Sequence, residues 1–407
     1  PVYIFMSVIV AIFMGLSVSA EEIIKDRKIL KREAFLNLSW SGYLLSKVAV
    51  QLMLSAIQAA AFVLIGNSIM EIRGMYLEYW IVLFSAWAAA NVMGLLISDS
   101  FKTVVTIYIL IPFLVIPQII LSGIIVKFEN LNPSISAPDR IPIYGEIITA
   151  RWAYEALATY QFKENEYQKH FYTAEKKKSV AGFMSSYLLQ NLENKLTEVT
   201  EHYQDPDKTE LVKNHLSLIR NELQKEYNDR LVFATYAEEI PTWKMKYISD
   251  LVPGTLNDSL LNHTMEYIQA LSAAYTDVYR RAFRESNEIK QEFDIEKLQE
   301  LKRNHHNNSL EEFVTNKNEF EKIVEYNGKL IQKTDPIYND PRSPFIKAHF
   351  YAPRKMVFGT FMPTIRVNVI VIWFMTIVLY ILLYYRVLKR LLDFFENFSW
   401  KKKTTPE

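Results

Sequence analysis

The sequence contains no cysteine among its 407 residues. A disulfide framework, a zinc site built on thiolates and a cysteine nucleophile are therefore excluded within this chain. The net formal charge is only +1, and the basic residues form no stripe with interleaved aromatic side chains, so nothing favours nucleic-acid binding. The motifs Gly-x4-Gly-Lys-Ser/Thr, His-Glu-x-x-His and Gly-x-Ser-x-Gly do not occur either. We therefore expect no phosphate loop, no catalytic site, no metal site and no bound cofactor in this chain.

The mean hydropathy of zero is misleading, because two apolar blocks flank a highly charged middle. About 18–20 apolar residues suffice for a helix to cross a bilayer. Five segments meet this description: 2–20, 44–69, 79–97, 103–126 and 367–385. The fourth contains two prolines and a glutamine, which a bilayer helix tolerates when neighbouring helices satisfy its backbone. A buried core helix of a soluble protein is the alternative for this segment.

Basic residues indicate the orientation. Lys25, Arg27, Lys28, Lys31 and Arg32 follow the first segment, and Arg386, Lys389, Arg390 and Lys401–Lys403 follow the last. Alternation of the segments brings both groups to one side, and short basic loops mark the cytoplasm. Residues 127–357 then lie outside. The chain starts at Pro1 inside an apolar segment and without an initiator methionine, so we interpret residue 1 as a position within a longer protein. A complete domain with an even number of spans and both ends inside would need one more helix before residue 1.

Residues 21–38 are basic with apolar positions at helical spacing, which predicts an amphipathic helix at the interface. A simple positive-inside anchor that needs no partner is the alternative. Arg32 and Glu33 could form a salt bridge at a cytoplasmic gate, or Glu33 could be an ordinary exposed helix partner. In the second segment, Gln51 and Gln58 are seven residues apart on one face, so we expect both to face other helices.

The outside region divides in two. Residues 127–162 are proline-punctuated and aromatic, and Arg151, Trp152, Tyr154 and Glu155 belong to a helical piece beside the membrane. Residues 163–345 are charged and predict a soluble helical domain, with helices near 180–203, 208–230 and 256–282. Ser309-Leu-Glu-Glu312 has the pattern of a capping box and predicts a helix reaching Tyr326. Residues 346–390 should hold the final span and 391–407 a cytoplasmic tail.

Two charged motifs of the outer domain have an ordinary interpretation as well as a functional one. His305-His306 could ligate a metal, but no second ligand stands at suitable spacing, so a solvated helix end is preferred. Lys176–Lys178 is interpreted as a hydrated charge run. No pair of carboxylates can be assigned as acid and base from spacing alone.

Four short motifs occur in order along the chain: Asp26-Arg-Lys with Arg32-Glu33, Gly94-Leu-Leu-Ile-Ser98, Ser122-Gly-Ile-Ile-Val126, and Ala150-Arg-Trp-Ala-Tyr-Glu-Ala-Leu157 closing in Gln161-Phe162. Together with the spacing of the apolar segments, they resemble the permease half of ABC-2 type transporters, and within them the ABCG/White group. The resemblance covers about residues 1–162 and 345–390.

The resemblance implies an all-α, polytopic membrane helix bundle in which the five segments are the family's helices two to six. It implies a nucleotide-binding domain outside this chain, which would bind ATP and Mg, and a second permease half, most simply in a homodimer. It also implies site residues: a substrate cavity at Ala11, Met14, Val115 and Ile119, an outer valve at Ile124 and Ile125, a coupling region at Asp26, Arg27, Arg32 and Glu33, and a re-entrant segment at Arg151, Trp152, Tyr154 and Glu155.

This chain departs from the family's multidrug member by having no aromatic or amide side chain at the cavity positions, which argues against stacking of aromatic drugs. Its lack of cysteine and its inserted domain point to a bacterial cytoplasmic membrane. We therefore expect an exporter of an amphiphilic substrate. The alternatives are an ATP-driven mechanical device that acts on an envelope partner without transport, and an extracytoplasmic enzyme or receptor anchored by the helices.

Overall fold

The computed structural model describes residues 1–32, 39–132, 136–138, 140–232, 247–343 and 345–403, and side chains as far as residue 396. The chain forms two compact units: Pro1–Gln161 with Lys355–Glu407, and Phe162–Arg354. Unit 1 contains α1 (Val2–Ser19), α2 (Glu22–Arg32), α3 (Trp40–Ile69), α4 (Tyr76–Ser100), α5 (Val104–Ile120), α6 (Ile143–Ile147), α14 (Thr364–Tyr384) and α15 (Val387–Lys403). Helix α7 (Thr149–Glu164) leads into unit 2, and a hairpin of β3 (Arg354–Val357) and β4 (Thr360–Pro363) leads back.

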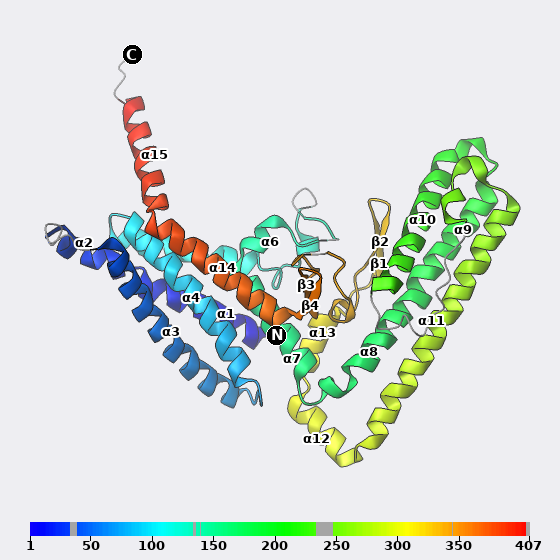
Figure 1. The fold of residues 1–407 in the computed structure, drawn as a ribbon, viewed down its shortest axis with the longest axis horizontal. Coiled ribbons are helices and arrows are strands. Elements are labelled where there is room, and N and C mark those ends of the chain that lie inside the picture. Colours follow the sequence, from blue (N-terminus) through cyan, green and yellow to red (C-terminus); the bar gives the residue numbers. More distant parts are fainter. Residues whose placement is uncertain (33–38, 133–135, 139, 233–246, 344, 404–407) are drawn as a thin grey trace. The chain divides into compact units, whose positions relative to one another are not determined.

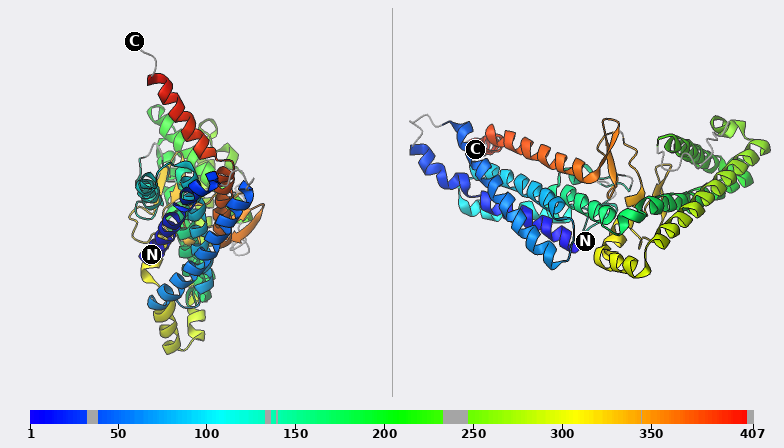
Figure 2. Two further views of the ribbon diagram at one scale, coloured as in Figure 1. Left: turned by 90° about the vertical axis from the view of Figure 1, so that its left-hand side faces the viewer. Right: turned by 60° about the horizontal axis from the view of Figure 1, so that its bottom comes forward.

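Unit 1 is a bundle in which α4 is central. Helices α1, α3 and α14 each pack against α4, and they run beside it in Figure 1 and in the right-hand view of Figure 2. Ala86, Ala88, Ala89 and Ala90 of α4 are buried. A Cβ atom added to Gly94 would collide with Ser19 of α1. These small residues therefore let α1 and α4 approach closely.

Among the described residues, four helical stretches are long and apolar enough to cross a membrane: Val2–Arg32, which joins α1 and α2, and helices α3, α4 and α14. Helix α5 is equally apolar but has 17 residues, or about 26 Å of length, which is the lower limit for spanning. The prediction that this helix reaches Val126 is wrong. It runs through both prolines and ends when the N–H of Leu121 bonds to Pro117 O, after which Gly123 has a φ of +79°.

Unit 2 is also mostly helical. It comprises α8 (Gln168–Phe183), α9 (Leu189–His202), α10 (Thr209–Val232), α11 (Asp258–Glu292), α12 (Ile295–His305) and α13 (Asn308–Thr315), with a hairpin of β1 (Ile323–Tyr326) and β2 (Lys329–Gln332). Apolar residues at helical spacing on α9, α10 and α11 form its core, and Leu330 of β2 joins them. The helix predicted near 256–282 is α11, with Ile268, Leu271, Tyr275 and Val278 buried as expected.

Several sequence predictions need correction. The described chain is not entirely helical, because two short hairpins are present. The helix predicted from Ser309 to Tyr326 stops at Thr315, because Asn316 adopts a left-handed backbone with φ +49°, and its cap is Asn307 rather than Ser309. The final span predicted at 367–385 corresponds to α14 (Thr364–Tyr384), so this prediction needs no correction beyond the β3–β4 hairpin that precedes the helix.

Candidate functional site

The first turn of α2 is hydrogen-bonded to the last turn of α4. A helix begins with backbone N–H groups that have no partner within the helix. The Ser98 hydroxyl oxygen accepts hydrogen bonds from two of them, those of Ile23 and Ile24, at 3.0 Å each. Ile23 is also buried in an apolar cluster with Leu44, Leu95, Leu96 and Leu383. A side chain of α4 thus caps α2, and the buried Ile23 of α2 adds an apolar contact.

Arg27 completes this contact from the α2 side. Its guanidinium donates to the carbonyl oxygens of Ser98, Asp99 and Phe101 at 2.9–3.1 Å. These carbonyls lie at the C-terminal end of α4, where helix carbonyls lack partners and the helix dipole favours a cation. One arginine therefore satisfies three backbone acceptors at the point where α2 turns away from the bundle.

Helix α3 holds α2 from a second side. Lys47 lies 2.9 Å from a carboxylate oxygen of Glu22 and 2.8 Å from one of Asp26, and the Tyr43 hydroxyl donates to Asp26 at 3.0 Å. These pairs are partly exposed, so each contributes little stability alone. We call the contacts of Glu22, Ile23, Asp26 and Arg27 with α3 and α4 the α2 docking site. They join α2 to two helices of the bundle at once.

The structure therefore separates the residues of the coupling region. Asp26 and Arg27 lie inside the α2 docking site. Arg32 is exposed as the last residue of α2. Glu33, and with it the idea of a gate salt bridge to Arg32, lies outside the described residues. Gln51 faces other helices as predicted, since it is buried and its backbone carbonyl accepts a hydrogen bond from the Asn91 side chain, whereas Gln58 is half-buried.

A second polar cluster lies at the other end of unit 1, around α7. Arg151 and Glu155 are one helical turn apart and both fully buried. Arg151 donates to Gly145 O at 2.9 Å, to Glu146 at 2.5 Å and to Glu155 at 3.2 Å. A buried charge is tolerated only when it is paired and hydrogen-bonded, and these contacts meet that requirement.

Two partners of Glu155 come from the distant end of the sequence. Lys355 of β3 donates to Glu155 Oε2 at 2.7 Å and to Asn368 Oδ1 at 2.9 Å. Asn368 of α14 donates to the same Glu155 oxygen at 2.9 Å and to Trp152 O at 2.9 Å. We call Glu146, Arg151, Glu155, Lys355 and Asn368 the α7 ionic cluster. It ties α7 to the start of the final apolar helix.

Burial lowers the pKa of Lys355 to about 8, with the attraction of Glu155 opposing that change and the positive charge of Arg151 reinforcing it. The ring centroid of Trp152 lies 3.7 Å from the Arg151 guanidinium carbon and 4.4 Å from the Lys355 nitrogen. Such cation–π contacts favour the charged forms of both side chains.

All four residues of the predicted re-entrant segment are buried: Arg151, Trp152, Tyr154 and Glu155. Tyr154 packs edge-on against Phe5 of α1, with ring centroids 6.1 Å apart. The backbone N–H of Ala150 bonds to the Gln118 side chain of α5 at 3.0 Å. Helix α7 is therefore held by α1, α5 and α14 together. Sequence reasoning missed Glu146, Lys355 and Asn368; a lone asparagine within an apolar span was the signal available for Asn368.

The residues implied to line a cavity lie on α1 and α5, which pack against one another. Ala11 and Val115 are buried, Ile119 is half-buried and Met14 is exposed. The valve residues Ile124 and Ile125 follow the end of α5, half-buried and exposed respectively. The four cavity positions share two neighbouring helices, and the function of all six residues stays a prediction.

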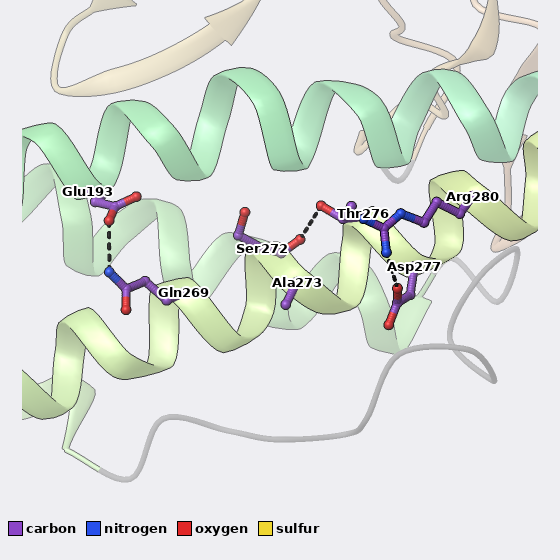
Figure 3. A pocket seen from close by; sticks show the side chains of 7 residues that line it. All are labelled: Glu193, Gln269, Ser272, Ala273, Thr276, Asp277 and Arg280. Carbon is purple, nitrogen blue, oxygen red and sulfur yellow. Dashed lines mark hydrogen bonds and ion pairs between the residues drawn. The ribbon is translucent and has the colours of Figure 1, made fainter.

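A shallow pocket of about 350 Å³ lies in unit 2 on α9 and α11 (Figure 3). Its lining is Glu193, Gln269, Ser272, Ala273, Thr276, Asp277 and Arg280. Gln269 donates to Glu193 at 2.9 Å, and Arg280 lies 3.5 Å from Asp277. Figure 3 shows the two carboxylates at opposite ends of the pocket, each directed to its own partner. This pocket therefore gives no support to the anchored-enzyme alternative, and no group of three potential metal ligands occurs among the described residues.

Comparison with known proteins agrees with this arrangement. Residues 1–162 match the model of the ABC-2 type transporter family. The ABC transporter ATP-binding/permease protein Rv1747 of Mycobacterium tuberculosis is 27% identical over 158 residues, which cover 36% of this chain and 17% of that protein. The chain thus spans only a small part of its curated relative, and no solved structure matches it. Residues 1–162 therefore belong to the membrane domain of the ABC-2 type transporter family.

Proposed function

We propose that this chain is the permease part of an ATP-driven exporter, powered by a nucleotide-binding domain that lies outside this chain. The observation that carries the proposal is the α2 docking site. Because α2 is bonded to α4 through Ser98 and Arg27 and to α3 through Lys47, force applied to α2 acts on the whole bundle. A helix held in this way can convert closure of an attached ATPase into rigid-body motion.

In this proposal, the nucleotide-binding domain binds Mg-ATP and presses on the exposed end of α2, where Arg32 lies. The bundle then rocks from an inward-facing to an outward-facing arrangement in a dimer, most simply of two identical halves. An amphiphilic substrate leaves the cavity lined by Ala11, Met14, Val115 and Ile119 and passes the apolar constriction at Ile124 and Ile125. The membrane is the cytoplasmic membrane of a bacterium, and unit 2 lies outside.

The test uses the parent protein with its nucleotide-binding domain, reconstituted in lipid. Spin labels on Ile125→Cys in the two halves report whether ATP and vanadate change the distance across the outer end. The double variant Arg32→Gln/Glu33→Gln should weaken that response by about fivefold or more, while ATP hydrolysis persists. Arg303→Gln, an exposed arginine of α12, should leave the response unchanged. An unaltered response in the double variant would contradict coupling through α2.

The valve assignment has its own test. Ile125→Ala shortens an apolar side chain at the proposed constriction, so basal ATP hydrolysis or leak of a small amphiphile should rise. Ile143→Ala removes the same atoms from another exposed isoleucine and should have no such effect. Equal behaviour of the two variants would place the constriction elsewhere.

A second candidate is the mechanical device that moves an envelope partner without transport. It is favoured by the length of the unit 2 helices: α11 has 35 residues, about 52 Å, and packs along α8 and α9. ATP-driven distance changes without transport of any amphiphile, lost when an envelope partner is removed, would support the device over the exporter.

A further inference from the structure

Helix α15 presents an apolar stripe on its surface. Val387, Leu391, Phe394 and Phe395 are 39%, 48%, 63% and 59% exposed. Their spacing of four, three and one residues brings them to one side of a helix. Lys389, Arg390 and Asp393 lie on the rest of the circumference. A helix with this pattern suits a boundary between an apolar and a polar medium.

Two further residues of α15 attach the helix to unit 1. Leu388 packs against the apolar cluster of Ile23, Leu44 and Leu383. The Lys102 amine, in the turn between α4 and α5, donates to both carboxylate oxygens of Glu396, at 2.9 and 2.6 Å. These contacts fix how the helix is rotated, and in this rotation the four residues of the apolar stripe remain exposed.

The position of α15 in the chain identifies what the stripe meets. Helix α14 is a spanning helix that ends at Tyr384. Arg386 has a left-handed backbone with φ +53°, which is uncommon for a residue other than glycine and stops the helix. Its guanidinium stacks on the Trp40 ring at 3.8 Å. Helix α15 therefore starts at the depth where the span ends, and it leaves α14 at an angle (Figure 1).

We propose that α15 lies in the interface of the leaflet at which α14 ends, with Val387, Leu391, Phe394 and Phe395 among the acyl chains. Tyr384 and Tyr385 mark the same depth, because tyrosine concentrates at membrane–water boundaries. Lys389 and Arg390 face the headgroups and attract anionic lipids. The partner of this surface is thus the lipid surface itself. Through Leu388 and Glu396, the interface helix holds the end of the bundle that carries the α2 docking site.

The test measures the depth of α15 in the full parent protein in lipid nanodiscs. Because this chain lacks cysteine, Leu391→Cys and Phe395→Cys can each carry one fluorophore, once any cysteine elsewhere in the parent is replaced. Asp393→Cys is the matched control, exposed on the same helix but off the stripe. Lipids brominated on their acyl chains should quench the labels at 391 and 395 about twofold more than the label at 393.

Equal quenching at the three positions would overturn the proposal. The proposal would also be overturned if positions 391 and 395 were protected from the labelling reagent in detergent, and if this protection required the nucleotide-binding domain or a second permease half. The stripe would then be a protein contact. If one labelled variant fails to assemble, Val387→Cys on the same stripe replaces it and should show the same quenching. Anionic lipids should strengthen the effect, and Lys389→Gln/Arg390→Gln should remove that dependence on lipid charge.

Discussion

The amine of Lys355 lies 2.7 Å from Glu155 Oε2, although 200 residues separate the two in the sequence. Both side chains are essentially inaccessible to solvent. The pair joins the hairpin that precedes the last span to the helix that follows α5, with Asn368 and Arg151 as additional partners. The α7 ionic cluster therefore fixes the ends of the apolar helices opposite the α2 docking site.

Replacing Lys355 with methionine leaves the carboxylate of Glu155 buried with one fewer cation. Removing one partner of a buried ion pair typically costs about 3–5 kcal/mol, so we expect Lys355→Met to lower the thermal unfolding temperature of the purified protein clearly. The double variant Glu155→Gln/Lys355→Met should lose less stability than the sum of the losses in the two single variants, because the two residues share one network.

Lys329→Met is the control for that prediction, because Lys329 is an exposed lysine of β2. It should change the unfolding temperature little. If the stability losses of the two single variants simply added in the double variant, or if Lys355→Met were as stable as the wild type, the cluster would not hold unit 1 together.

The depressed pKa of Lys355, about 8, also predicts a pH dependence. Below about pH 8, Lys355 is protonated in both the folded and the unfolded state, so it does not change how the free energy of unfolding depends on pH. Between about 8 and its ordinary value of 10.5, the unfolded chain binds more protons, so rising pH favours the folded state. The stability of the wild type relative to Lys355→Met should therefore increase from pH 8 to pH 10. Unfolding temperatures measured from pH 7 to 10 test this, and a difference that is level or falls would contradict it.

Periodicity and hydropathy predicted the long elements well, because burial of an apolar face dominates their formation. Helices α3, α4, α10 and α11 follow the expected apolar patterns. The side-chain contacts within the sites could not be predicted from the spacing of residues in the sequence. Lys176, in a charge run interpreted as hydrated, is buried 2.7 Å from Asp340, and Lys355 meets Glu155 only after the chain has folded. Pairs at such sequence separations depend on tertiary packing, which local patterns do not encode.

Ser98→Ala removes the oxygen that accepts from the N–H groups of Ile23 and Ile24. Loss of a helix cap costs about 0.5–2 kcal/mol, so the first turn of α2 should open more often. Hydrogen exchange of the amides of residues 23–27, followed by mass spectrometry, should become faster. Ser46→Ala, which removes an exposed hydroxyl bonded within α3, should leave that exchange unchanged. If both variants exchange like the wild type, Ser98 does not hold α2.

Gly123→Ala should destabilise the turn after α5 for two reasons. The backbone has φ +79°, and an added Cβ would collide with the ring of Phe128. Gly74→Ala separates the two effects, because Gly74 has φ +74° but nothing within 4 Å of an added Cβ. Strain alone should cost about 1 kcal/mol or somewhat more, so the unfolding temperature should fall further for Gly123→Ala than for Gly74→Ala. If the unfolding temperature fell equally in both variants, the turn at Gly123 would accommodate a Cβ atom without a clash with Phe128.

The proposed export mechanism depends most on the topology, in which unit 2 and the basic ends of unit 1 lie on opposite sides of one membrane. Single cysteines introduced as Lys329→Cys and Arg390→Cys, both at exposed positions, can be probed with a membrane-impermeant maleimide in sealed right-side-out vesicles. We predict labelling at position 329 in intact vesicles and at position 390 only after permeabilisation. Labelling at 390 but not 329 in intact vesicles would contradict the topology and the export mechanism built on it.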